Sequence, residues 1–195
     1  MTHATRRSGR RGAVAGVELS VDDWTEEIVI EDRTLTVRPI REDDVDRLRR
    51  LFYRLSPETV YWRFFQPVKQ PSEKLLHHLA EVDHDLRQAI VAELDDELIA
   101  VVRYDRTSAS SIAEVAVLVE DAWQGHGVGR KLLRRLAADA LEHGVTEMSA
   151  TVLGQNQRAL RLAHHVAPDT HGQLDQGEWL LDFHLPAAGT GVRSA

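Results

Sequence analysis

Residues 115–130 read Val115-Ala116-Val117-Leu118-Val119-Glu120-Asp121-Ala122-Trp123-Gln124-Gly125-His126-Gly127-Val128-Gly129-Arg130. An apolar run typical of a strand leads into an acidic break, then into three glycines at alternate positions, and a helical pattern follows. Glycines let the backbone turn sharply and point several N–H groups into one concavity. The following helix adds unpaired N–H groups and the positive end of its dipole. The stretch therefore predicts a binding site for a phosphate or pyrophosphate group.

The common nucleotide-binding loops do not match this stretch. A Walker loop ends in Gly-Lys-Ser/Thr, whereas Gly129 is followed by Arg130-Lys131-Leu132, which offers no magnesium-binding hydroxyl. A dinucleotide fingerprint has the spacing G-x-G-x-x-G in a parallel βαβ unit, with an acidic residue about 20 positions later. Here the spacing is G-x-G-x-G, and the helix lies late in the chain. The phosphate is therefore expected to belong to a different kind of ligand.

The hydrophobic pattern of the whole chain predicts elements in the order β, α, α, α, β, β, β, α, β, α, β, β. Ser56 followed by Pro57 predicts one helix start, and Asn156 predicts another. The expected fold is mixed α/β, with a mostly antiparallel central sheet flanked by helices and one parallel βαβ crossover. The predicted strands are 35–38, 88–94, 98–104, 112–119, 148–153, 171–174 and 178–185, and the helices are 42–55, 57–66, 72–82, 128–143 and 155–166.

Length and composition narrow the class of protein. A chain of 195 residues suits one domain, which we place at residues 31–186, between a mobile N-terminal tail at 1–30 and a C-terminal tail at 187–195. The absence of cysteine excludes disulfides and thiolate metal sites. A net charge of −7 argues against nucleic-acid binding, and no apolar run approaches the roughly 20 residues that cross a membrane. The basic start makes a poor signal peptide, so we expect a cytoplasmic protein without nucleic-acid or membrane partners.

The pattern Gln124-Gly125-His126-Gly127-Val128-Gly129 resembles the Q/R-x-x-G-x-G/A signature of the GNAT superfamily of acetyl-CoA-dependent N-acyltransferases. The order of elements over roughly residues 34–185 is similar to the GNAT fold. The segment 55–65, Leu55-Ser56-Pro57-Glu58-Thr59-Val60-Tyr61-Trp62-Arg63-Phe64-Phe65, looks like the branch that contains the bacterial Pat-type protein-lysine acetyltransferases. The resemblance implies acetyl-CoA as co-substrate, no metal, and a primary amine as acceptor, with a protein lysine as the expected one.

The resemblance also implies which residues hold the cofactor. The glycine loop would hold the pyrophosphate of coenzyme A, and the backbone of Val117 and Val119 would pair with its pantetheine arm. Arg130 lies in the first helical turn, where it either reaches a phosphate or remains solvated. Asn156 matches a family asparagine that contacts the cofactor arm, although a helix cap explains it nearly as well. The candidate cofactor-binding residues are Val117, Leu118, Val119, Gln124, Gly125, His126, Gly127, Val128, Gly129, Arg130 and Asn156.

Acetylation of an amine needs a base, because a lysine side chain has a pKa near ~10.4 and only its neutral form attacks a thioester. Glu114 is the one charged residue in the apolar run 112–119. Its place resembles that of the family's catalytic glutamate, which removes the proton directly or through water. By alternation Glu114 shares a face with Ala116 and Leu118. The alternative is a solvated glutamate on the exposed face of a strand.

At the position of the proton donor to the leaving thiolate, this sequence differs from the family pattern. The family commonly has a tyrosine where this chain has Ala163. His164 is the candidate replacement, and a histidine on the helix surface is the alternative. No metal site is expected, since adjacent histidines such as His164 and His165 point about 100° apart on a helix.

Three functions therefore stay open at the level of the sequence. The first is acetylation of a protein lysine, and the second is acetylation of a small-molecule amine. The third is acyl-CoA binding without catalysis, by a regulatory module. Turnover of acetyl-CoA with an amine separates the first two from the third.

Overall fold

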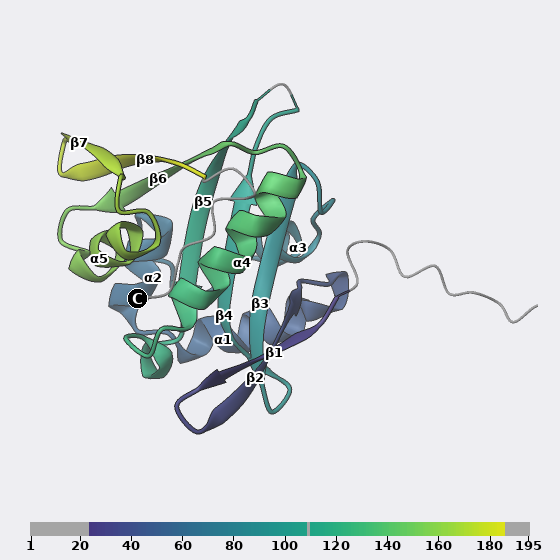
Figure 1. Ribbon diagram of the computed structural model, residues 1–195. Coiled ribbons are helices and arrows are strands. Elements are labelled where there is room, and N and C mark those ends of the chain that lie inside the picture. Colours follow the sequence, from purple (N-terminus) through teal and green to yellow (C-terminus); the bar gives the residue numbers. More distant parts are fainter. Residues whose placement is uncertain (1–23, 109, 186–195) are drawn as a thin grey trace, which may run out of the picture.

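The computed structural model describes residues 24–108 and 110–185, which form an eight-stranded sheet with helices on both faces (Figure 1). The strand order is β1-β2-β3-β4-β5-β6-β8-β7, and every neighbouring pair is antiparallel except β5 and β6. The structure thus confirms the mixed, mostly antiparallel α/β sheet with one parallel pair.

The elements have the following bounds. The strands are β1 (Glu26–Ile30), β2 (Arg33–Pro39), β3 (Arg87–Leu94), β4 (Glu97–Asp105), β5 (Ile112–Val119), β6 (Glu147–Leu153), β7 (His171–Asp175) and β8 (Glu178–His184). The helices are α1 (Val45–Arg54), α2 (Pro57–Phe64), α3 (Glu73–Ala80), α4 (Val128–Glu142) and α5 (Gln157–Val166), with short 3-10 turns at η1 (Glu42–Asp44) and η2 (Asp121–Trp123).

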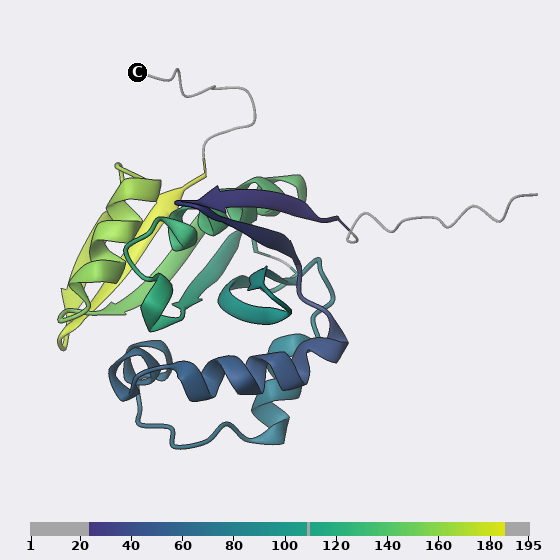
Figure 2. The same ribbon diagram turned by 90° about the horizontal axis from the view of Figure 1, so that it is seen from below.

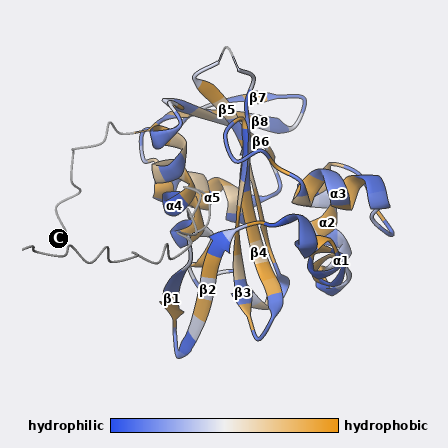
Figure 3. Cartoon of the chain, turned by 90° about the vertical axis from the view of Figure 1, so that its right-hand side faces the viewer, coloured by the Kyte–Doolittle hydropathy of each residue, from blue (hydrophilic) through white to orange (hydrophobic). Residues whose placement is uncertain are grey.

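Helices cover both faces of the sheet. α1, α2 and α3 lie on one face, and α4 and α5 lie on the other (Figures 2 and 3). The face under α4 and α5 carries the larger hydrophobic cluster, which includes Val115 and Phe183. The opposite face carries a second cluster around Leu51 and Leu98. Burial on both faces explains why β3 and β4 are apolar along most of their length. Among the described residues, no helix is long and apolar enough to cross a membrane.

Helices α2 and α5 begin where the sequence predicts. Pro57 is the first residue of α2, and the Ser56 hydroxyl accepts a hydrogen bond from the Thr59 N–H at 3.1 Å. The Asn156 side chain accepts from the Ala159 N–H at 3.0 Å and caps α5. Both caps are therefore confirmed. Each cap satisfies an N–H group of the first turn and fixes the residue at which the helix starts.

The parallel pair of β5 and β6 is short. Residues 112–114 of β5 pair with residues 147–149 of β6. Beyond Glu114, β5 continues along β4 to Val119, while β6 follows β8 to Leu153. The two strands therefore part, and in the described chain one edge of β5 from Val115 onward has no strand beside it. Backbone groups on such an edge are free to pair with a ligand.

Strand β1 corrects the domain boundary drawn from the sequence. Residues 26–30 pair with residues 33–37 of β2, and Ile30 is buried. The sequence placed residues 1–30 in a tail because the alternation around Ile28 and Ile30 is short and does not stand out in an acidic segment. In the structure Trp24, Ile28 and Ile30 pack on the core. The remainder of the predicted tails, 1–23 and 187–195, falls outside the described residues.

Candidate functional site

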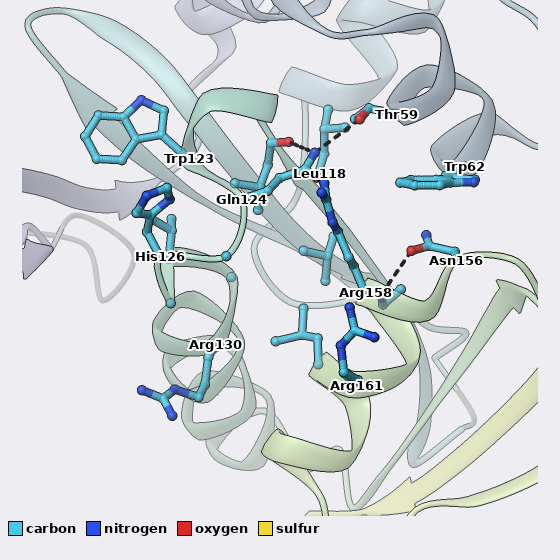
Figure 4. Close-up of a pocket in the computed structure, with 18 of the residues that line it drawn as sticks. Thr59, Trp62, Leu118, Trp123, Gln124, His126, Arg130, Asn156, Arg158 and Arg161 are labelled. Carbon is cyan, nitrogen blue, oxygen red and sulfur yellow. Dashed lines mark hydrogen bonds between the residues drawn. The ribbon is translucent and has the colours of Figure 1, made fainter. Parts of the chain in front are cut away.

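A cavity of about 690 Å³ lies between the glycine loop, β5, α2 and α5 (Figure 4). Every candidate cofactor-binding residue predicted from the sequence lines it, although these residues come from a strand, a loop and two helices. Their function as cofactor ligands remains a prediction. The lining residues are Glu31, Thr59, Trp62, Arg63, Val117, Leu118, Val119, Trp123, Gln124, Gly125, His126, Gly127, Val128, Gly129, Arg130, Asn156, Arg158, Ala159, Arg161, Leu162 and His165.

The three glycines of the loop serve two purposes. Gly125 and Gly127 have φ angles of +84° and +87°, a region in which other residues are strained. Gly129 has no such angle, but a Cβ there would lie 3.3 Å from Leu162 Cδ2 and 3.5 Å from Val119 Cγ2. The first two glycines therefore shape the turn, and the third lets α4 approach β5 and α5 closely.

Helix α4 begins at the cavity without a side-chain cap. Gly127 is its N-cap residue, and Lys131 donates its N–H to the Gly127 carbonyl at 3.1 Å. The N–H groups of Val128, Gly129 and Arg130 therefore precede the hydrogen-bond ladder of the helix. Together with the helix dipole, they favour an anion in the cavity.

Basic side chains surround the same space. Arg158 and Arg161 of α5 lie across the cavity from the loop, whereas the Arg130 guanidinium points away from them (Figure 4). His165 also lines the cavity, and among the described lining residues Glu31 is the one carboxylate. This excess of basic groups favours a ligand with several negative charges.

Sequence reasoning did not single out Arg158 and Arg161. The signal that the sequence offers is spacing, because residues 158, 161 and 165 recur at intervals of three and four and so lie on one face of a helix. That pattern alone describes any solvated helix face. The packing of α5 beside α4 is what brings this face to the glycine loop, and such packing is a tertiary feature.

Gln124 connects three elements across the cavity. Its side-chain N–H groups donate to the Val119 carbonyl at 3.0 Å and to the Thr59 hydroxyl at 3.1 Å. Its side-chain oxygen accepts from Arg158 at 2.7 Å. Gln124 therefore holds β5, α2 and α5 together above the loop and orients the Arg158 guanidinium.

Asp121 fastens the start of α2 to the end of β5. Its carboxylate accepts from the Ser56 N–H at 2.9 Å, the Ser56 hydroxyl at 2.7 Å and the Thr59 hydroxyl at 2.8 Å. Burial raises the pKa of Asp121, but the hydrogen bonds from Ser56 and Thr59 outweigh burial and hold this pKa below its ordinary value. The ionised carboxylate therefore stabilises the folded state.

We expect Asp121→Asn to destabilise the fold by about 1–3 kcal/mol at neutral pH, the usual range for hydrogen bonds to a charged group. Asparagine keeps one acceptor oxygen but loses the charge and the second acceptor. Because the folded-state pKa of Asp121 is lowered, its contribution is present above the unfolded-state pKa of about 3.9 and is lost as the pH falls through the folded-state value. Urea unfolding should show a constant deficit from about pH 5 to 8 that shrinks below about pH 4.

The matched control for this prediction is Asp175→Asn, since Asp175 is exposed on β7. Equal stabilities of the two variants at neutral pH contradict the prediction. A deficit of Asp121→Asn that stays unchanged down to about pH 3 contradicts it too, because the carboxylate contribution must decline below the unfolded-state pKa.

Glu114 lies outside the lining of this cavity. It occupies the third position of β5, where it pairs in regular register with Asp105 and Ser149, and its side chain is exposed. Alternation predicts that Glu114 and Leu118 share one face of the sheet. Leu118 packs with the cluster under α1 and α3, so this is the face on which those helices lie. Glu114 is three residues, or about 10 Å, along the strand from Val117 at about 3.3 Å per residue. Both the catalytic and the solvated interpretation of this glutamate stay open.

The position of His164 favours the second interpretation of this residue, a histidine on the helix surface. His164 is exposed and does not line the cavity, whereas His165, the next residue, does. One residue changes the direction of a helical side chain by about 100°, and the sequence alone does not fix which direction meets the cavity. The Nδ1–H of His165 donates to the Arg161 carbonyl at 2.7 Å. In the part of the chain that the structure describes, no group of three or more His, Asp or Glu side chains is placed to hold a metal ion.

The chain is similar in sequence and fold to known acetyltransferases. The Acetyltransferase (GNAT) family matches residues 51–166. Acetyltransferase PA5475 from Pseudomonas aeruginosa is 34% identical over 160 residues, which cover 80% of this chain and 84% of that protein. Acetyltransferase Pat from Mycolicibacterium smegmatis is 37% identical over 123 residues, which cover 62% of this chain and 37% of that protein. The GNAT domain of S. lividans PAT matches with a TM-score of 0.78 and 35% identity, covering 83% of this chain and 97% of that domain.

Proposed function

The chain belongs to the acetyltransferase (GNAT) family, and from this premise we propose that it transfers the acetyl group of acetyl-CoA to the side-chain amine of a protein lysine. Acetyl-CoA-dependent acyl transfer follows from family membership. The acceptor and the roles of individual residues are the proposed part. The observation that carries the roles in cofactor binding is the single cavity in which the glycine loop, the uncapped start of α4 and two arginines of α5 meet.

In this proposal the cofactor lies along the cavity with its phosphates at the glycine loop. The amides of Gly127, Val128 and Gly129 donate to the pyrophosphate, where the dipole of α4 adds to the attraction. Arg158 and Arg161 supply positive charge from the opposite wall. The pantetheine arm, which is an amide chain, pairs with the backbone edge of β5 from Val115 onward that the departing β6 leaves open.

The chemistry requires a neutral amine, an aligned carbonyl and a stabilised oxyanion. We assign Glu114 as the base, and its position outside the cavity lining favours a route through water over direct contact. The amine nitrogen forms a bond with the acetyl carbonyl carbon, and the carbon–sulfur bond breaks with its electron pair on sulfur. Glu114 is exposed at the end of β5 where the strand begins, so a lysine side chain can approach it beside α2.

The assignment of a protein lysine as acceptor is supported by residues 55–65 and by the relatives. The segment around Ser56 and Trp62 resembles the Pat branch, and Trp62 lines the cavity. The M. smegmatis relative bears the name Pat, and the S. lividans domain belongs to PAT. A small-molecule amine is the second candidate, because Glu114 is exposed on β5 and an acceptor of either kind can reach it.

The proposal is tested first by thermal unfolding with acetyl-CoA, CoA and ATP. A ligand present at 100 times its Kd stabilises the fold by about 2.7 kcal/mol, so acetyl-CoA and CoA are expected to raise the Tm and ATP to leave it nearly unchanged. Next, acetyl transfer is measured with a lysine-containing peptide set and with free amino acids and polyamines. Transfer to free amines alone overturns the lysine assignment. Binding of acetyl-CoA without acetyl transfer to any amine overturns catalysis and favours a non-catalytic acyl-CoA-binding module.

A further inference from the structure

A second cavity of about 120 Å³ continues from the first into the gap where β5 and β6 part. The two cavities share six lining residues, among them Val117, Asn156 and Leu162. Most other walls are apolar and come from β5, β6, β8, α4 and α5, for example Met148 and Phe183. On the same measure a single water needs about 10–15 Å³, so the second cavity has room for a chain of several non-hydrogen atoms.

Small side chains create this space. Ala150 of β6 and Ala159 and Ala163 of α5 all line the second cavity. Ala163 stands where the resemblance described above places a tyrosine, and a phenol ring at this position would occupy the gap. The space therefore depends on the residues of this chain and adjoins the end of the first cavity at which the pantetheine arm would finish.

One charged side chain lines the second cavity, and no described residue accepts a hydrogen bond from it. Arg63 of α2 lines both cavities, and it makes no hydrogen bond or ion pair with any residue that the structure describes. Its Cζ lies over the Phe64 ring at 5.2 Å from the centroid. None of the described residues lining the second cavity is acidic. The charges of Asp105 and Glu114 act on Arg63 without contacting it, and a partly buried guanidinium without a hydrogen-bond acceptor is costly, so an anionic ligand is the expected partner.

Charged groups on both sides act on Arg63. Burial, followed by the positive charge of Arg103, lowers the pKa of Arg63 to about 10, against the opposing charges of Asp105 and Glu114. Arg63 therefore remains protonated at neutral pH. The phosphates of a bound CoA lie at the glycine loop in the proposed function, so they do not supply the missing anion. The remaining source next to the second cavity is the acyl group itself.

We propose that the second cavity receives an acyl chain of the succinyl class, with about two methylene groups and a terminal carboxylate, and that Arg63 binds this carboxylate. The inference rests on the proposed function, because it needs a CoA thioester in the first cavity. The methylene groups meet the apolar walls, and the carboxylate forms charge-assisted hydrogen bonds with the guanidinium. A neutral chain of the same length fills the space but leaves Arg63 unpaired.

The chemical step is unchanged by the longer acyl group. The acceptor amine forms an amide bond with the thioester carbonyl carbon of succinyl-CoA, and the carbon–sulfur bond breaks with its electron pair on sulfur. The proton lost from the amine nitrogen passes to the base and then to solvent or to the thiolate. The products are an N-succinyl amide and free CoA, and no oxidant or reductant takes part.

The test compares kcat/KM for succinyl-CoA, butyryl-CoA and acetyl-CoA with one accepted amine. Butyryl-CoA has the same chain length as succinyl-CoA without the carboxylate, so the succinyl-to-butyryl ratio isolates the contribution of Arg63. We expect this ratio to be about 10 or more in the unmodified protein, the range for one charge-assisted hydrogen-bonding pair. A ratio at or below one, or transfer of acetyl alone, overturns the inference. No binding of any acyl-CoA instead overturns the proposed function.

Two variants sharpen the result. Arg63→Met is expected to bring the ratio to one or below, and Ala163→Phe is expected to reduce transfer of both four-carbon chains relative to acetyl. The control is Arg134→Met, since Arg134 is exposed on α4 and lines neither cavity. A ratio that falls equally in Arg134→Met overturns the assignment of Arg63. If Arg63→Met does not fold, the ratio in the unmodified protein decides by itself.

Discussion

Replacing Gly127 by glutamate is expected to weaken acetyl-CoA binding by at least about 100-fold, or about 2.7 kcal/mol. Gly127 is the N-cap residue of α4, and its φ of +87° favours glycine. A glutamate there distorts the loop amides and places a carboxylate beside the position proposed for the pyrophosphate. Isothermal titration calorimetry with acetyl-CoA measures the loss directly.

The matched control is Gly144→Glu. Gly144 has a φ of +79°, and no atom lies within 4 Å of the position that a Cβ would take, so a side chain there meets the same backbone strain without a clash. It lies beyond the C-terminal end of α4, away from the cavity. Both variants should lose stability, and Gly127→Glu alone should lose affinity. Similar affinities in two folded variants contradict the assignment of the glycine loop.

Gly129→Glu is a less direct test of the same loop. A Cβ at this position meets Leu162 Cδ2 at 3.3 Å, which is tighter than ordinary contact. The larger side chain therefore separates α4 from α5 and disturbs the fold together with the cavity. A loss of binding in that variant would have two causes, the disturbed packing of α4 on α5 and the altered cavity. In Gly127→Glu the change lies at the loop itself, close to the ligand.

The features predicted correctly from the sequence are those that a short segment determines. The caps at Ser56 and Asn156 depend on residues three positions apart, and the strand pattern of β5 depends on alternation. The glycine loop follows from backbone conformation at Gly125 and Gly127. Each of these features carries its physical cause within a few residues, so one sequence is enough to recognise it.

The features that the sequence did not reveal depend on packing between distant segments. Strand β1 is stable because β2 pairs with it, and its own pattern is weak. Arg158 becomes part of the site because Gln124, 34 residues earlier, accepts its hydrogen bond. Arg63 stands within an aromatic run that reads as core, and the packing of α2 against β5 places it beside both cavities.

The choice between His164 and His165 shows the same limit on a smaller scale. The helical pattern predicts that the two side chains diverge, and that prediction holds. Which of them meets the cavity depends on how α5 is rotated about its axis. That rotation is set by the contacts of Leu162 and Val166 with the hydrophobic cluster around α4, which involve residues far apart in the sequence.

Replacing Glu114 by glutamine is expected to slow acyl transfer by roughly 10²–10⁴-fold, the usual contribution of a positioned general base. Glutamine keeps the shape and hydrogen-bonding reach of the side chain but cannot accept the proton. Acetyl-CoA affinity should hardly change, because Glu114 does not line the cavity that holds the cofactor in our proposal. The expected signature is therefore a lower kcat with an unchanged Kd for acetyl-CoA.

The dependence on pH distinguishes a base from a structural residue. For an amine with a pKa near ~10.4, the neutral fraction rises about tenfold with each pH unit up to that value, so the variant should recover part of its rate as the pH rises. The measurement is kcat from about pH 6 to 9 for the unmodified protein, Glu114→Gln and the control Glu147→Gln. Glu147 lies on the neighbouring strand, where it pairs with Ile112 and lines neither cavity.

Equal rates in all three proteins at every pH would mean that Glu114 is a solvated strand residue. The proton would then leave through water alone or through His165, whose Nδ1–H is held by the Arg161 carbonyl and whose other ring nitrogen remains free to accept.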